Sequence, residues 1–335
     1  MKTIAHFIIV TALLVVSTSA PAKSWRINNN LTADPDFTSI NAAMSSTNVQ
    51  AGDTLYLDPG CSLSGDQTVN KQVTIVGPGY FRADTPHAFS YLQNTLYIRA
   101  AYTKVEGIIM SNADIIIYAQ HVTIERCKLR DVRVGGYYDD ARYATIRQCY
   151  GNQIYGQGWT SNNCAYCTIE NCILRRDGTC IYDFYIPTIR QNYIMTSNSS
   201  HVLSSLESAS ITDNVIINTA NSNYIFNYIA NPVNISNNVI SGNENANYPV
   251  NKYGNTEAAV FKLEGLNDQR YQLKDDSPAK GYATDGGDCG PFGGLYPYVL
   301  GGLPNGYPYY TKAIIAPKSV NGKVNVSLNI KMQND

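Results

Sequence analysis

One nine-residue pattern recurs six times in the middle of the chain and constrains the fold more than any other feature. The copies read HVTIERCKL (121–129), YATIRQCYG (143–151), YCTIENCIL (166–174), IPTIRQNYI (186–194), SASITDNVI (208–216) and PVNISNNVI (232–240). Their central isoleucines follow one another at intervals of 20 to 24 residues. A nearly constant period of this length is the signature of a solenoid.

Each copy predicts two short strands joined by a tight corner. In five of the six copies, the isoleucine and an apolar residue five positions later bracket a Cys or Asn, and this spacing is not helical. A third strand is predicted before each following copy, in the segments DVRV (131–134), QIYG (153–156), CIYD (180–183), HVLS (201–204) and YIFN (224–227). Three strands per repeat make one coil of a parallel β-helix, in which stacked coils bury a common core.

The segments outside the repeats divide the rest of the chain. Residues 1–22 are predicted as a signal peptide, 23–50 as an N-terminal cap, 51–252 as the β-helix and 253–335 as a C-terminal cap with a terminal strand. In the N-terminal cap, Phe37, Ile40 and Met44 share one face of a short predicted helix. The C-terminal cap is rich in Gly, Pro and Tyr, and we expect it to cover the far end of the solenoid. The alternating KVNVSLNI (323–330) predicts the terminal strand.

The first 22 residues indicate export. An apolar run from Ile8 to Val16 precedes the small residues Ala20 and Ala22, which predicts cleavage after Ala22. The run is shorter than the ~20 residues that span a bilayer, and no later stretch is long and apolar enough to do so. We therefore expect a secreted, periplasmic or cell-surface protein without a membrane span.

Charge and cysteine content exclude some classes of function. A formal net charge of −1 argues against nucleic acid as a partner, because binding phosphates requires a concentrated basic surface. The repeat places Cys127, Cys149 and Cys172 in one corner column, continued by Asn192, Asn214 and Asn238. These thiols are interpreted as packing groups rather than metal ligands. For Cys164 or Cys167 we expect a disulfide, with Cys180 as a candidate partner, rather than a zinc site.

The chain resembles the right-handed parallel β-helix proteins of the pectate lyase-like superfamily. The resemblance rests on the TIxxC/NxI repeats, on INAAM (40–44) with VQAGDTLYLDPG (49–60), and on YQLKDDSPAKGYATDGGDCGPFGG (271–294). It extends to uncharacterised exported proteins of Bacteroidetes-type bacteria. The superfamily includes polysaccharide lyases, glycoside hydrolases, epimerases and structural or adhesive fibres. The resemblance therefore implies an all-β solenoid, but it carries over no catalytic residue.

Two enlarged loops mark the expected binding site. GGYYDDAR (135–142) and GQGWTSNNCAY (156–166) interrupt neighbouring coils on the same edge, and long loops on a rigid scaffold often carry function. Strand alternation points Arg133, Tyr155, Tyr182 and Tyr224 outward beside them. Aromatic rings stack on sugars, so the candidate substrate-binding residues are Tyr137, Tyr138, Trp159, Tyr155, Tyr182 and Tyr166. The candidate catalytic residues are Asp139, Asp140, Arg142, Asp183 and Arg133. The alternative is that these tyrosines merely cover a sheet.

These residues predict an exported protein that processes a polysaccharide and needs no cofactor. A lyase would use arginines, with Ca²⁺ held by Asp139 and Asp140. A hydrolase would use two carboxylates, for which the candidates are Asp131, Asp139, Asp140, Asp177 and Asp183. The alternative to an enzyme is a glycan-binding or structural, adhesive β-helix. The expected partner is a glycan of either acidic or neutral type, and the protein is expected to be a monomer.

Overall fold

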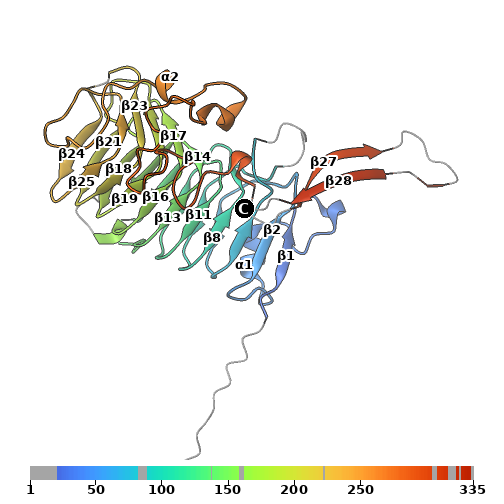
Figure 1. The fold of residues 1–335 in the computed structure, drawn as a ribbon. Helices are drawn as coiled ribbons and strands as arrows, with labels where there is room; N and C mark the ends of the chain where they lie inside the picture. The colour runs from blue at the N-terminus through green and yellow to red at the C-terminus, as the bar shows by residue number, and fades with distance from the viewer. Residues whose placement is uncertain are drawn as a thin grey trace, which may run out of the picture.

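The protein is a parallel β-solenoid, as the repeat predicts. The computed structural model describes residues 21–81, 89–136, 138–157, 162–221, 223–303, 308–315, 322–323 and 326–332. Tyr137, Trp159 and most of the predicted signal peptide lie outside these ranges. Figure 1 shows the coils stacked side by side, with strands β1 and β2 at one end and the hairpin of β27 and β28 projecting away from the stack.

Three parallel sheets, A, B and C, run the length of the solenoid. Sheet A contains β1 (Ser24–Ile27), β2 (Thr54–Leu57), β5 (Thr74–Val76), β8 (Lys104–Glu106), β11 (Thr123–Glu125), β13 (Thr145–Arg147), β16 (Thr168–Glu170), β19 (Thr188–Arg190), β22 (Ser210–Thr212) and β25 (Asn234–Ser236). Sheet C contains β4 (Gln67–Val69), β7 (Leu96–Ile98), β10 (Ile115–Ile117), β12 (Asp131–Val134), β15 (Gln153–Gly156), β18 (Ile181–Tyr185), β21 (Leu203–Glu207) and β24 (Phe226–Ala230).

Sheet B is built from two shorter groups of parallel strands. The first group is β3 (Ser62–Leu63), β6 (Tyr91–Leu92) and β9 (Ile109–Met110). The second group is β14 (Tyr150–Gly151), β17 (Ile173–Arg176), β20 (Tyr193–Thr196), β23 (Val215–Asn218) and β26 (Val239–Ile240). Single bridges from Lys128 to Ile109 and to Tyr150 connect the two groups.

The repeated isoleucine builds the core. Adjacent coils place these residues in register on sheet A, and all are buried: Ile124, Ile146, Ile169, Ile189, Ile211 and Ile235. Burying one such side chain contributes roughly 1.5–3 kcal/mol. Because no single coil can bury its own isoleucine on both sides, the stack rather than the coil is the stable unit.

The predicted corner column is confirmed. Asn214 Nδ2 donates to Asn238 Oδ1 (2.9 Å), and Asn192 Nδ2 donates to Asn214 Oδ1 (3.0 Å). The column extends one coil further than predicted, to Asn251. The eight cysteines are buried thiols, so the expected disulfide of Cys164 or Cys167 is not formed in the structure.

Short helices and one additional strand complete the N-terminal end. Helix α1 (Ile40–Ser45) is capped by Ser39 and buries Ile40 and Met44 against the end of the core. Phe37 lies outside the helix, where it packs on Trp25 with ring centroids 5.5 Å apart. Strand β1 lies within the segment predicted as the N-terminal cap and pairs with β2.

The chain after the last coil folds back along the solenoid. It contains α2 (Glu257–Val260) and the 3-10 helices η3 (Asn267–Tyr271) and η4 (Leu300–Gly302); η1 (Leu31–Ala33) and η2 (Asn162–Cys164) lie earlier. We call residues 256–303 the C-terminal segment. Its Phe261 and Tyr271 pack with Tyr193 and Val215 of sheet B in a second buried cluster. The segment therefore covers the outer face of sheet B, whereas we expected it over the far end of the solenoid (Figure 1).

The C-terminal segment is held coil by coil at the corners between sheets A and B. Asp213 accepts hydrogen bonds from the backbone N–H and the hydroxyl of Thr284, both at 2.8 Å. Asn171 and Gln148, at the equivalent corners of earlier coils, donate to backbone carbonyls of the segment. Beyond it, β27 (Pro308–Ile315) and β28 (Val326–Met332) form an antiparallel hairpin that contains the predicted terminal strand.

Candidate functional site

The outward groups of sheet A pair with one another. Arg147 donates to Glu125 (3.0 Å) and Arg190 donates to Glu170 (2.7 Å), each pair joining adjacent strands. Lys104 also reaches Glu125 at 3.2 Å. These ion pairs between adjacent strands support the register of sheet A. Since the C-terminal segment covers sheet B and the outward charges of sheet A pair with one another, sheet C carries the candidate site.

Sheet C carries a row of outward side chains along the solenoid. In register order they are Thr68, Tyr97, Ile116, Arg133, Tyr155, Tyr182, Ser204 and Asn227. The rings of Tyr155 and Tyr182 are stacked, with centroids 5.1 Å apart and an interplanar angle of 6°. Two of the predicted binding residues therefore form one aromatic surface.

Tyr224 does not belong to this row. Strand β24 pairs Phe226 with Leu203, so Asn227 rather than Tyr224 takes the outward position. Tyr224 lies before the strand, where its ring contacts His201 at 4.8 Å. The aromatic row consequently ends at Tyr182.

An open depression of about 380 Å³ lies beside Tyr182. Its lining consists of Arg176, Asp177, Gly178, Thr179, Tyr182, Asn198, Ser200, Ser204 and Ser205. Tyr155 covers one face of the Tyr182 ring, and the small Ser204 follows on the other side, so the second face borders the depression. Within the described chain, the side chains of Arg176 and Asp177 form no hydrogen bond or ion pair with another residue.

Two carboxylates meet on adjacent strands of the same sheet. Asp114 directly precedes β10, and Asp131 begins β12, which pairs with β10. Arg130 Nε lies 3.5 Å from Asp114 Oδ1 and 3.6 Å from Asp131 Oδ2. The Oδ1 atoms of both aspartates are buried without a hydrogen-bond partner among the described residues. Burial and the negative charge of Asp131 raise the pKa of Asp114, although Arg130 and Arg133 oppose this shift.

Sequence reasoning included Asp131 among the hydrolase candidates but missed Asp114. The available signal was its position: Asp114 stands immediately before a third strand, as Asp131 stands at the start of the next one. Because the strands of a parallel sheet are in register, equal positions in successive coils lie side by side.

Arg133 connects the carboxylates with the aromatic row. Its Nη2 donates to the Tyr118 hydroxyl at 2.7 Å, and Arg99 lies 4.5 Å from the Tyr118 ring. Burial and the charge of Asp114 raise the pKa of Tyr155, whereas Arg133 lowers it. The charge of the predicted residue Arg133 thus acts on both Asp114 and Tyr155.

The acidic residues of the first loop are engaged locally. Asp140 accepts hydrogen bonds from Arg142 Nε (2.9 Å) and Nη2 (2.7 Å), and this contact holds the pKa of Asp140 below its usual value. The carboxylate of Asp139 lies so close to the backbone of Gly136 that a Cβ atom on residue 136 would overlap it. No group of three or more His, Cys, Asp or Glu side chains suited to a metal occurs in the described chain. Asp140 and Arg142 are therefore paired with each other within the loop.

The remaining predicted residues lie at different distances from the depression. Burial raises the pKa of Asp183, and its hydrogen bond with Ser205 lowers it; Ser205 lines the depression. Tyr138 is 90% exposed at the tip of the first loop. Asp183 borders the candidate site, and Tyr138 does not line the depression.

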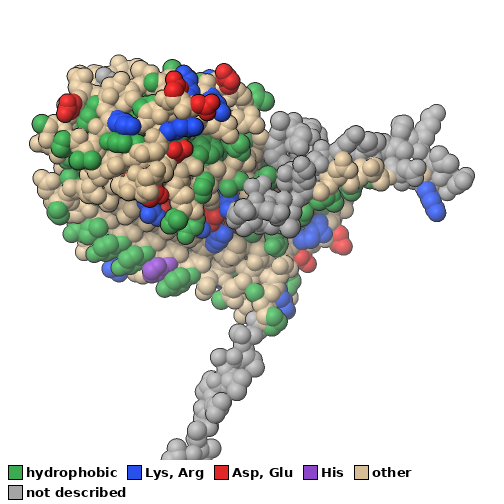
Figure 2. Space-filling view, in the orientation of Figure 1, with side chains coloured by type: hydrophobic (Ala, Val, Ile, Leu, Met, Phe, Trp, Pro, Cys, Tyr) green, Lys and Arg blue, Asp and Glu red, His purple; other side chains and the backbone are tan. Residues whose placement is uncertain are grey.

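Tyr166 belongs to a separate aromatic ladder formed by Tyr102, His121, Tyr143 and Tyr166. Successive ring centroids are 4.7, 4.9 and 5.2 Å apart, and the planes differ by at most 9°. The ladder lies at the corner between sheets C and A, and its three tyrosines are more than a third exposed. Figure 2 shows a row of hydrophobic side chains with a histidine among them along the lower edge of that view. Tyr166 is thus not part of the sheet C surface.

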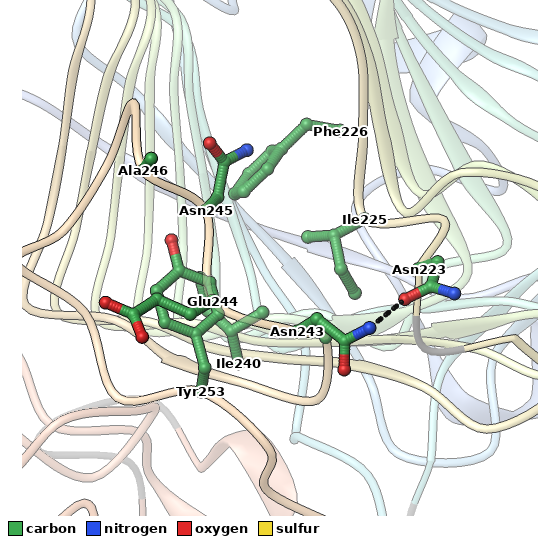
Figure 3. A pocket seen from close by; sticks show the side chains of 10 residues that line it. Asn223, Ile225, Phe226, Ile240, Asn243, Glu244, Asn245, Ala246 and Tyr253 are labelled. Carbon is green, nitrogen blue, oxygen red and sulfur yellow. Dashed lines mark hydrogen bonds between the residues drawn. The ribbon is translucent and has the colours of Figure 1, made fainter.

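A second pocket, of about 260 Å³, lies where the last coil meets the chain that follows it (Figure 3). Its apolar lining includes Ile225, Ile240 and Tyr253, and Asn243 Nδ2 donates to Asn223 Oδ1 at 3.0 Å across its edge. Glu244 is the single carboxylate in the lining, and Tyr253 is the other titratable residue there. The pocket lacks the paired groups that hydrolysis needs, so sheet C remains the candidate site.

No protein-family model matches the chain, and no curated protein matches it. Among the residues that the structure describes, none of the helices has the length and apolar character required to cross a membrane.

Proposed function

We propose that the protein is an exported glycoside hydrolase that binds a polysaccharide along the outer face of sheet C. Export is the expectation from the first 22 residues of the sequence, and the site combines an aromatic surface with paired carboxylates. A polymer lying along the solenoid axis would contact Asp114 and Asp131 at one position and Tyr155 and Tyr182 one and two coils further on.

The carboxylate pair is the observation that carries this proposal. Hydrolysis of a glycosidic bond requires one carboxyl group that is protonated and a second that is ionised. Asp114 and Asp131 lie on adjacent strands within reach of Arg130. Burial and the negative charge of Asp131 raise the pKa of Asp114, and this direction favours Asp114 as the proton donor.

In the proposed reaction, Asp114 donates its proton to the oxygen of the leaving sugar as the glycosidic C–O bond breaks. Asp131 attacks the anomeric carbon and forms a glycosyl ester, because carboxylates on adjacent strands, about 4.8 Å apart, leave no room for a water molecule at this step. Water then cleaves the ester: Asp114 removes a proton from it, its oxygen bonds to the anomeric carbon, and Asp131 is released as a carboxylate. The products are two sugar chains, one with a new reducing end. Arg130, whose side chain is 49% exposed, partly neutralises the negative charge of the two carboxylates before substrate binds.

Non-catalytic binding is the second candidate function. It is favoured by the burial of the Oδ1 atoms of Asp114 and Asp131, because a buried carboxylate has less access to a substrate. The ion pairs of the two acids with Arg130 would then serve only to join adjacent coils. Elimination by a lyase is less favoured, because Asp140, expected to bind Ca²⁺, is already neutralised by Arg142.

A glycan screen with matched variants tests the proposal. Neutral and acidic polysaccharides are incubated with the protein, and new reducing ends are compared with the ultraviolet absorbance of unsaturated products. We expect reducing ends without that absorbance. Asp114→Asn and Asp131→Asn should each lower the rate at least about a hundredfold, whereas Asp276→Asn, at an exposed carboxylate of the C-terminal segment, should not.

The results separate the candidates. Unsaturated products would replace hydrolysis by elimination. Retained glycan binding without any product would support the non-catalytic function. Full activity in both Asp114→Asn and Asp131→Asn would move catalysis away from this pair.

A further inference from the structure

The depression beside Tyr182 lies where the next member of the aromatic row would stand. Tyr155 and Tyr182 stack at 5.1 Å, close to the about 4.8 Å that separates adjacent strands. The next strand contributes Ser204 at the same register position. Its short side chain leaves the second face of Tyr182 open to the depression, where a third ring would continue the stack.

The groups around this space suit a sugar ring. Ser200, Ser204 and Ser205 contribute hydroxyl groups, and Asn198 contributes an amide. Tyr182, the last aromatic residue of the row, offers an apolar ring face to the depression. Sugar rings combine an apolar face of C–H groups with hydroxyls around the edge, and this combination matches an aromatic face surrounded by polar side chains.

The charges of the lining indicate which sugar fits. Arg176 and Asp177 are its charged residues, and their formal charges cancel. An anionic sugar would gain from Arg176 but would be opposed by Asp177, since like charges in a partly enclosed site repel. A neutral ring can use both side chains as hydrogen-bonding partners.

We propose that this depression is a binding subsite for a neutral pyranose unit. The sugar ring stacks on the face of Tyr182 that is turned toward Ser204, where a third aromatic ring would stand. The inference rests on the proposed function in that the ligand is a glycan, but it does not depend on cleavage. The subsite lies two strands from Asp131 along sheet C, through β15 to β18, so a bound polymer would extend from it toward the carboxylate pair.

Filling the gap provides the sharpest test. Ser204→Tyr supplies the missing ring from the protein itself and should block the subsite while keeping the fold, because it extends an existing stack. Tyr182→Ala removes the stacking face. Thr68→Tyr, at the opposite end of the same outward row, and Tyr102→Ala, in the exposed ladder, are matched controls.

Binding is measured by calorimetry with cello-, xylo-, manno- and galacto-oligosaccharides and with oligogalacturonate as the acidic comparison. We expect a neutral oligosaccharide to bind, and Ser204→Tyr and Tyr182→Ala to weaken it at least about tenfold. Thr68→Tyr and Tyr102→Ala should leave the affinity within about twofold. Circular dichroism and thermal denaturation check that Ser204→Tyr is folded.

Three results would overturn the subsite: no binding of any neutral oligosaccharide, unchanged affinity in a folded Ser204→Tyr variant, or preference for oligogalacturonate that declines with added salt. The outcome is independent of catalysis. Binding that depends on Tyr182 without cleavage would retain the subsite and reject the hydrolase, whereas cleavage unaffected by Ser204→Tyr would do the reverse.

Discussion

The hydroxyl oxygens of Tyr80 and Tyr298 lie 2.6 Å apart, although 218 positions separate the two residues in the chain. Tyr298 donates to Asp268 at 3.0 Å, so Tyr80 is the donor to Tyr298. Asp268 also accepts the backbone N–H of Gly301 at 2.7 Å. This buried network ties the C-terminal segment to an early coil.

Removing the Tyr298 hydroxyl should loosen the C-terminal segment. Tyr298→Phe leaves the buried Tyr80 hydroxyl without its acceptor and Asp268 with one donor fewer, so we expect a loss of about 1–3 kcal/mol in unfolding free energy. Denaturant unfolding measures the loss, and limited proteolysis reports whether the segment detaches first. Tyr296→Phe is the control, because Tyr296 is 42% exposed. Equal stability of the two variants would contradict the role of the network.

Glu125 should make the solenoid sensitive to acid. Burial tends to raise its pKa, but Lys104 and Arg147 outweigh burial and lower it. A carboxylate whose pKa is lower in the folded protein stabilises the fold above its unfolded pKa of about 4.3, and this contribution is lost as the pH falls through the folded value.

Glu125→Gln should therefore cost about 1–3 kcal/mol at neutral pH, and its difference from wild type should shrink below about pH 4. Chemical denaturation at a series of pH values measures both quantities. Glu264→Gln, at an exposed position, should change little at any pH. A deficit of Glu125→Gln that stays constant down to pH 3 (roughly a unit below the unfolded pKa) would contradict this assignment.

The corner column should tolerate loss of a thiol better than loss of an amide. Asn214 Nδ2 donates to the backbone carbonyls of Ile189 and Thr212, and its Oδ1 accepts from the Asn192 backbone N–H. Asn214→Ala orphans these buried groups and should cost about 2–4 kcal/mol. Cys149→Ala mainly removes a small apolar group and should cost about 1–2 kcal/mol. Thermal denaturation compares the two, and the reverse order would show that packing dominates.

The buried cysteines should be unreactive in the native protein. Burial raises the pKa of Cys164 to about 11 and those of Cys180 and Cys289 to about 12, so the reactive thiolate is rare near neutral pH. Iodoacetamide should label few thiols of the native protein, and mass spectrometry after unfolding without reductant should find 8 labels. Six labels would instead indicate one disulfide, as first expected for Cys164 or Cys167.

The candidate site was predicted in part. Strand alternation placed Tyr155 and Tyr182 outward correctly. The predicted segment QIYG is the observed strand β15, and β18 (Ile181–Tyr185) overlaps the predicted CIYD (180–183) without changing the alternation at Tyr182. Strand alternation failed at Tyr224, where strand β24 begins two residues later than the matching pattern suggested. The sequence pattern favoured the adjacent acids Asp139 and Asp140 of the first loop, yet Asp140 pairs with Arg142. Asp114, which was not predicted, lies beside Asp131 and shares Arg130 with it.

The sequence by itself determined the solenoid, its period, the buried isoleucines and the corner column, because each coil repeats one local pattern and identical patterns stack in register. Only the tertiary structure decided which outward residues meet across coils, where the aromatic row ends and where the C-terminal segment lies. These depend on loop lengths and on contacts between residues far apart in the chain, such as Asp213 with Thr284, for which no local periodicity carries a signal.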